Sequence, residues 1–102
     1  PLHLDLLKGG VTPADLEAVL VKRYAGSDVV RVVTAETNGK LEPQALNGTN
    51  GLEIRVYGNE KRGQAVLVAR YDNLGKGASG AAVQNLGLML GIPVSADLPK
   101  AA

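Results

Sequence analysis

The feature that most constrains this chain is the junction at residues 71–85, where a strand pattern leads directly into a helix pattern. Its sequence is Tyr71-Asp72-Asn73-Leu74-Gly75-Lys76-Gly77-Ala78-Ser79-Gly80-Ala81-Ala82-Val83-Gln84-Asn85. Three glycines, a lysine and a run of small residues at such a junction indicate a backbone held close to a ligand or to another part of the protein. The rest of the chain is then expected to serve as scaffold.

Length and composition narrow the class of protein. A chain of 102 residues is one domain or part of one, and 45% hydrophobic with 21% charged residues is typical of a soluble globular protein. A net charge of +1 without Trp or Phe argues against a nucleic-acid partner. No apolar run reaches the roughly 20 residues of a membrane span, so we expect a cytoplasmic protein with no membrane partner. The start at Pro1 suggests a piece of something longer.

The absence of cysteine limits the chemistry of the chain. With no Cys there is no disulfide framework, no thiolate metal site and no cysteine nucleophile, and we assign no metal-binding residues. The only histidine, His3, falls on the outward face of a predicted strand, where a lone polar residue is usually solvated rather than catalytic.

Hydrophobic spacing predicts the elements of the first third. Alternation of Leu2, Leu4 and Leu6 with polar residues predicts a strand. Thr12, Pro13 and Asp15 are typical of a helix start, and Gly26 of a helix end. The apolar face of this helix comprises Leu16, Val19, Leu20 and Tyr24.

The rest of the chain predicts a sheet and a final helix. The β-branched run 29–33 favours a central strand, and residues 34–50 are polar and turn-rich, with one helical turn at 43–46. Alternating segments 52–57 and 65–71 predict an antiparallel hairpin around the loop 58–63. A final helix is predicted whose apolar face is formed by Ala78, Ala82, Leu86, Met89 and Leu90, and Gly91 and Pro93 end it. The fold class is therefore α/β (α+β), with a mixed, mainly antiparallel sheet backed by helices.

Ligand motifs compete for the glycine-rich junction. Residues 75–80 match G-x-G-x-x-G, and Asp97 lies 22 residues beyond Gly75, near the spacing of the ribose-binding acid of dinucleotide sites. That fingerprint belongs to the first βαβ unit of a parallel sheet, whereas here it closes the chain, with only residues 92–94 available as a next strand. A phosphate loop needs Ser or Thr after Lys76, and a serine elbow at Ser79 needs a second glycine at position 81.

Structural explanations remain open beside the ligand ones. The glycines and alanines can let the helix pack closely on a neighbouring element. Asp72-Asn73 can simply form a turn, and Asn47-Gly48-Thr49 is better explained as a turn than as a glycosylation site.

A family resemblance adds to these patterns. Residues 72–86, followed by Leu88-Met89-Leu90-Gly91, resemble the C-terminal signature of the N-acetyl-gamma-glutamyl-phosphate reductase family, in its shorter variety. Asn47-Gly48-Thr49-Asn50 with the strand after it, and Tyr24-Ala25-Gly26 with the strand at 29–32, resemble further segments of that family. The resemblance covers nearly the whole chain, to about Gly91.

The resemblance implies an NADPH-dependent, glyceraldehyde-3-phosphate-dehydrogenase-like semialdehyde dehydrogenase of arginine biosynthesis. Such enzymes reduce an acyl phosphate to a semialdehyde through a thioester on a cysteine, assisted by a histidine, and form homo-oligomers. Residues 1–91 would be part of the catalytic and oligomerisation domain, ending in a C-terminal helix at about 77–91, and residues 92–102 would be a tail.

The resemblance also assigns candidate site residues. It places Asn73 beside the nicotinamide and Gly75, Lys76, Gly77 and Ala78 along the cofactor. It places Gly48, Thr49 and Asn50 near the substrate or at a sheet contact. The chain departs from the family because the cysteine, the histidine motif and the nucleotide-binding domain all precede Pro1, and His3 does not match. We therefore assign no catalytic residue here and expect the chain alone neither to reduce the acyl phosphate nor to bind NADPH tightly. The alternative is a non-catalytic structural or self-association domain.

Overall fold

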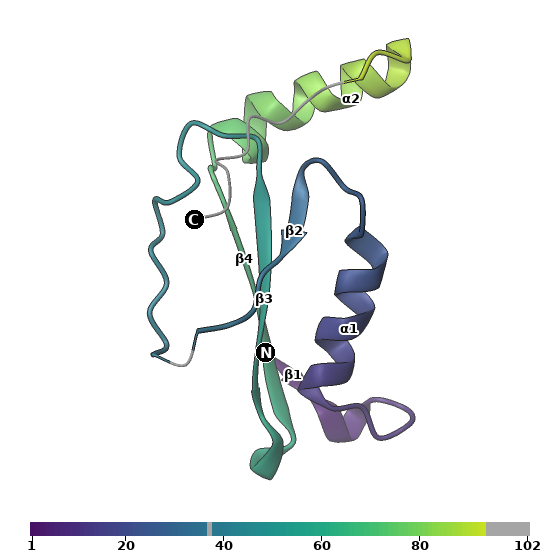
Figure 1. Cartoon of the computed structure of the whole chain (residues 1–102), viewed down its shortest axis with the longest axis vertical. Helices are drawn as coiled ribbons and strands as arrows, with labels where there is room; N and C mark the ends of the chain where they lie inside the picture. The colour runs from purple at the N-terminus through teal and green to yellow at the C-terminus, as the bar shows by residue number, and fades with distance from the viewer. Residues whose placement is uncertain (37, 94–102) are drawn as a thin grey trace.

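The fold is a four-stranded mixed sheet with one helix across a face and a second helix at one end (Figure 1). The computed structural model describes residues 1–36 and 38–93. The strands are β1 (Leu2–His3), β2 (Val30–Val32), β3 (Leu52–Asn59) and β4 (Gln64–Tyr71), and the helices are α1 (Pro13–Tyr24) and α2 (Gly80–Leu90). The sheet order is β1-β4-β3-β2, with β2 parallel to β3 and the other pairs antiparallel. The predicted mixed, mainly antiparallel sheet with helices is confirmed.

Helix α1 begins as its local sequence predicts. The Thr12 hydroxyl accepts a hydrogen bond from Asp15 N at 3.2 Å, and the Asp15 carboxylate accepts one from Thr12 N at 2.9 Å. This capping box satisfies two amides that would otherwise lack partners, and it lowers the pKa of Asp15. Pro13 lies against Gly58 of β3, where an added side chain would overlap it. The close contact at Gly58 lets α1 lie directly on the sheet.

The β3–β4 hairpin forms the centre of the molecule. Its ladder runs without a bulge from the Leu52–Tyr71 pair to the Asn59–Gln64 pair, as the alternating segments predict. A short 3-10 turn, Glu60–Arg62, closes the hairpin, and Gly63 follows it with φ of 59°. Because side chains alternate along a strand, even-numbered positions of β3 face α1 and odd-numbered positions face the connecting segment 33–51.

The N-terminal strand is shorter than predicted. β1 stops at His3, and the chain turns through a 3-10 turn at Leu4–Leu6. Leu4 N donates to Gly63 O, and Gly63 lies just before the first residue of β4. A longer β1 would therefore have no strand residue to pair with. Leu4 is buried, whereas Leu6 is 79% exposed.

Strand β2 lies at an edge of the sheet, so its predicted central position is wrong. Within residues 1–36 and 38–93 its only partner is β3. A run of β-branched residues indicates that side chains pack on both faces of a strand. It does not indicate that the strand has a hydrogen-bonded neighbour on each side. The run 29–33 has such packing, since α1 covers it and Val29 is buried.

The connecting segment between β2 and β3 folds without a helix. The helical turn predicted at 43–46 is instead a series of turns over 43–48, with Asn47 N donating to Gln44 O and Thr49 N to Leu46 O. Leu46, at 2% exposure, is the most deeply buried large side chain among the described residues.

Helix α2 extends away from the end of the sheet (Figure 1). It follows a π-helical turn at Gly75–Ser79 and is capped by Gly91 in the left-handed region. Its predicted apolar face is open to solvent in this chain, since Leu86, Met89 and Leu90 are 53%, 82% and 61% exposed. Among the described residues, no helix is long and apolar enough to cross a membrane. The Asp97 of the dinucleotide interpretation, the end of the strand at 92–94 and most of the expected tail lie outside the described residues.

Candidate functional site

The glycine-rich junction is tied to the connecting segment by one carboxylate. Asp72, just past the end of β4, accepts hydrogen bonds from Gly48 N at 2.8 Å and from Leu74 N at 3.0 Å. These two backbone bonds lower the pKa of Asp72. The bond to Leu74 forms the predicted turn, and the bond to Gly48 joins positions 24 residues apart.

The glycines of the junction lie against this same segment. A methyl group on Gly75 would come within 2.6 Å of Thr49 O, and one on Gly80 would overlap Asn50 Oδ1 and come within 2.7 Å of Gly75 O. The cofactor candidates of the junction and the substrate candidates at 48–50 are therefore in contact. The close backbone approach indicated by the sequence is confirmed at Gly75 and Gly80, and its partner is the protein itself.

The same geometry weakens the dinucleotide interpretation. The glycines of such a fingerprint leave room for a pyrophosphate, whereas Gly75 and Gly80 leave room for Thr49 and Asn50. The junction also follows an antiparallel hairpin rather than the first strand of a parallel βαβ unit.

The candidate cofactor residues divide into two groups. Gly75 is half-buried, and Lys76 Nζ donates to Gln84 Oε1 of α2, so both are engaged within the chain. Asn73, Gly77 and Ala78 are exposed on one short stretch of the junction. Asn73, Gly77 and Ala78 are therefore the members of this group that are open to an external contact.

The candidate substrate residues have structural partners. The Thr49 hydroxyl donates to Leu46 O at 2.7 Å and accepts from Gly51 N at 3.3 Å. The Asn50 Oδ1 atom is buried without a hydrogen-bond partner among the described residues. Buried side-chain oxygens are normally paired, so Asn50 is the one member of this group with hydrogen-bonding capacity left over.

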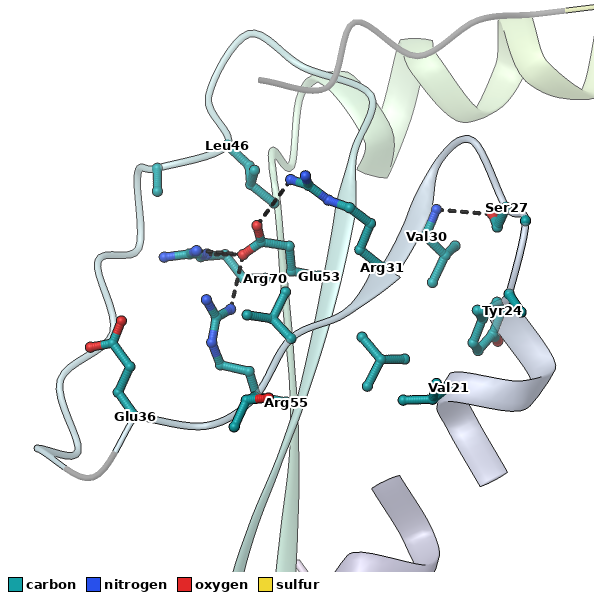
Figure 2. A pocket seen from close by; sticks show the side chains of 16 residues that line it. Val21, Tyr24, Ser27, Val30, Arg31, Glu36, Leu46, Glu53, Arg55 and Arg70 are labelled. Carbon is teal, nitrogen blue, oxygen red and sulfur yellow. Dashed lines mark hydrogen bonds and ion pairs between the residues drawn. The ribbon is translucent and has the colours of Figure 1, made fainter. Parts of the chain in front are cut away.

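A buried cluster of charges lies elsewhere on the sheet, on the face opposite α1. The Glu53 carboxylate, on β3, accepts from Arg31 at 3.2 Å, from Arg55 at 2.9 Å and from Arg70 on β4 (Figure 2). Arg70 also donates to Glu42 O at 2.8 Å, which joins the connecting segment to the sheet. These side chains lie together because Glu53 pairs with Arg31 and Arg70 in the strand register.

The electrostatics of Glu53 reflect two opposing effects. Burial raises the pKa of this carboxyl, but hydrogen bonds and positive charges from Arg70 and Arg55 outweigh burial, so the net pKa is below its ordinary value. Glu53 is therefore ionised at neutral pH.

Sequence reasoning did not find this cluster. The four residues alternate with apolar ones, which is typical of a solvated strand face, yet the connecting segment covers them. The available signal was the presence of Arg, Glu and Arg at positions that face one another once the hairpin register is known. His3 is exposed and pairs with Gln64, away from both groups.

Comparison with known proteins tests the resemblance. A family model described as the semialdehyde dehydrogenase dimerisation domain matches residues 2–73. The chain belongs to this semialdehyde dehydrogenase family.

Curated relatives sharpen the family assignment. The chain is 55% identical over 94 residues to the N-acetyl-gamma-glutamyl-phosphate reductase of Burkholderia cenocepacia, covering 89% of the chain and 30% of that protein. It is 50% identical over its full length to the protein of the same name from Burkholderia lata, of which it covers 32%. The match to the Brucella ovis reductase is 51% over 94 residues, 89% of the chain and 30% of the relative. This chain thus spans about a third of the length of these relatives.

Proposed function

We propose that this chain is the C-terminal part of an N-acetyl-gamma-glutamyl-phosphate reductase, which converts N-acetyl-glutamyl phosphate to N-acetyl-glutamate semialdehyde in arginine biosynthesis in the cytoplasm. The observation that carries the proposal is the 50–55% identity to reductases of that name over 89–100% of the chain. The junction is consistent with it, because residues 72–80, which carry part of the family resemblance, pack against residues 48–50, which carry another part.

In this proposal the residues of this chain position the cofactor and do not carry out the chemical step. A cysteine nucleophile is needed to displace phosphate from the acyl phosphate and form a thioester, and no cysteine occurs in this sequence. NADPH supplies the hydride that reduces the thioester. Asn73, with the exposed backbone of Gly77 and Ala78, is the part of this chain that would contact the cofactor. Asp72 and the 48–50 segment hold that surface in place.

A chimeric enzyme tests the proposal. The 30% of the Burkholderia cenocepacia reductase that this chain matches is replaced by residues 1–102, and acyl-phosphate-dependent NADPH oxidation is measured. We expect turnover by the chimera and none by the 102-residue chain. A folded chimera without turnover, or sustained turnover by the chain alone, would contradict the proposal.

A paired substitution in the chimera tests the cofactor contact. Asn73→Ala should raise the KM for NADPH by about tenfold, the size expected when one polar ligand contact is lost. Asn59→Ala, at an exposed position in the hairpin, is the matched control and should leave KM unchanged. Equal KM values for both variants would show that the Asn73 side chain does not contact the cofactor.

Self-association is the second candidate function. The family model is described as a dimerisation domain, and α2 exposes Val83, Leu86, Leu88 and Met89 at 53–82%. Apolar surface of this extent favours association. Light scattering of the chain should give a mass above 10.5 kDa, and a clean monomer at high concentration would count against this function.

A further inference from the structure

The Glu53 cluster carries more positive than negative charge. One carboxylate accepts from three guanidinium groups, which leaves a formal excess of two positive charges. The side chains of Arg55 and Arg70 are only 8% and 12% exposed, and that of Arg31 is 26% exposed. Like charges so close together and so shielded from water repel one another, and an anion placed among them would relieve the repulsion.

The arginines also have donors left over. The Nε atom of Arg31 is buried and has no hydrogen-bond partner among the described residues. Among the described residues, Arg55 makes one side-chain hydrogen bond, from Nη1 to Glu53. A guanidinium has five N–H donors and no acceptor, so neither arginine is saturated by the single carboxylate that it shares.

The cluster opens into space of molecular size. A cleft of about 760 Å³ runs around the edge strand β2, with Arg31, Glu53, Arg55 and Arg70 on one face of the sheet and Val21, Tyr24 and Val30 on the α1 face (Figure 2). A second hollow of about 360 Å³ is lined by Glu36, Lys40, Leu41, Glu42, Arg55 and Arg70. Arg55 and Arg70 line both spaces, so their guanidinium groups are reachable from either side.

The charged residues around the cleft restrict the ligand class. Arg31, Arg55, Arg70 and Lys40 are positive, and Glu53, Glu36 and Glu42 are negative. The Glu53 carboxylate is already paired with the three arginines, and the Glu42 carboxylate accepts a hydrogen bond from Gln44 N. Planar guanidinium groups bind planar or tetrahedral oxyanions through paired hydrogen bonds, whereas a cation would meet the arginines directly.

We propose that the cleft beside the Glu53 cluster binds a small organic or inorganic anion through a carboxylate or phosphate group held by Arg55 and Arg31. The inference rests on the charges of this chain and does not depend on the proposed function.

Phosphate and malonate titrations of the 102-residue chain test the site. Backbone and arginine side-chain NMR signals are followed at constant ionic strength, with chloride replaced by either anion. We expect saturable shifts at Arg31 Nε, at Arg55 and in β3, with a dissociation constant in the millimolar range. Saturation by phosphate alone or malonate alone would identify which group the site prefers.

Matched substitutions separate binding from structure. Arg55→Gln should weaken binding at least about tenfold, because it removes a shielded guanidinium. Arg31→Gln, at the more exposed position, guards against misfolding of the first variant and should weaken binding about threefold or more. Arg62→Gln removes the same charge at an exposed site in the hairpin turn and should bind as the wild type does.

Two outcomes would overturn the proposal. Linear, non-saturating shifts equal to those seen with chloride would show that the arginines serve only to tie the connecting segment to the sheet. Equal loss of affinity in Arg31→Gln and Arg62→Gln would show that the response depends on net charge alone.

Discussion

The glycine-rich junction and the Glu53 cluster hold the same connecting segment against the sheet by opposite means. At the junction, small residues let backbones touch, and one carboxylate binds Gly48 N and Leu74 N. In the cluster, long charged side chains meet over a strand face, and Arg70 reaches Glu42 O. The first device depends on the absence of side chains, and the second on their length and charge. The two regions should therefore respond differently to substitution.

Removing the central carboxylate should give the largest effect. Glu53→Gln leaves three arginines around an uncharged side chain, and breaking a buried ion pair from one side costs about 3 kcal/mol or more. We expect the free energy of unfolding in urea to fall by about that amount. Glu60→Gln, at an exposed position of the hairpin turn, is the control and should change it by less than about 0.5 kcal/mol. A small effect for both would show that the cluster contributes nothing to stability.

A methyl group added at the junction should have the next largest effect. Gly80→Ala places a carbon within 2.7 Å of Gly75 O, so the junction must shift, and overpacking of this kind costs about 2 kcal/mol. Gly77→Ala is the matched control, because its nearest neighbours, the Tyr71 ring at 3.0 Å and the Asn73 amide, are side chains that can move. Urea unfolding should therefore separate the two variants. If both are neutral, close packing does not explain the glycines and contact with a ligand becomes the better explanation.

The sequence predicted the elements whose signals are local. The capping box of α1 and the alternation of the hairpin are each contained within a short segment, and both form as predicted. The junction was found for the same reason, since Gly75, Gly77 and Gly80 lie close together in the sequence. The family resemblance selected residues 48–50 as site candidates, but their contact with the junction was not predicted, because a bond between Asp72 and Gly48 leaves no local pattern.

The features that were missed depend on contacts between distant segments. β1 ends opposite the first residue of β4, and β2 lies at an edge because of strand order, which spacing within a strand does not encode. The Glu53 cluster requires both the hairpin register and a segment of irregular backbone above it, and neither is encoded in the alternation along a single strand.

Acid should weaken both regions in the same direction. The pKa values of Glu53 and Asp72 lie below their ordinary values of 4.5 and 3.8, so the unfolded chain binds more protons than the folded chain at acid pH. Their contribution is complete above the ordinary values and is lost as pH falls through the lower values of the folded state. We expect the melting temperature to decline below about pH 4.5 and the decline to be shallower in Glu53→Gln. An equally steep decline in that variant would assign the acid sensitivity to other carboxylates.

The smallest expected effect is at the exposed end of the junction. Asp72→Asn keeps an oxygen that can accept from Gly48 N or Leu74 N but removes the charge that strengthens both bonds. Global stability should change little, because the carboxylate is at the surface, whereas the amide of Gly48 should exchange with solvent faster. Hydrogen exchange followed by NMR measures this, with the Thr49 amide, which donates to Leu46 O within its own turn, as an internal reference. Faster exchange at Gly48 alone would show that the junction is joined to the connecting segment mainly through Asp72. Equal acceleration at both amides would show that the whole segment has loosened, and unchanged exchange at both would leave the glycine contacts as the principal connection.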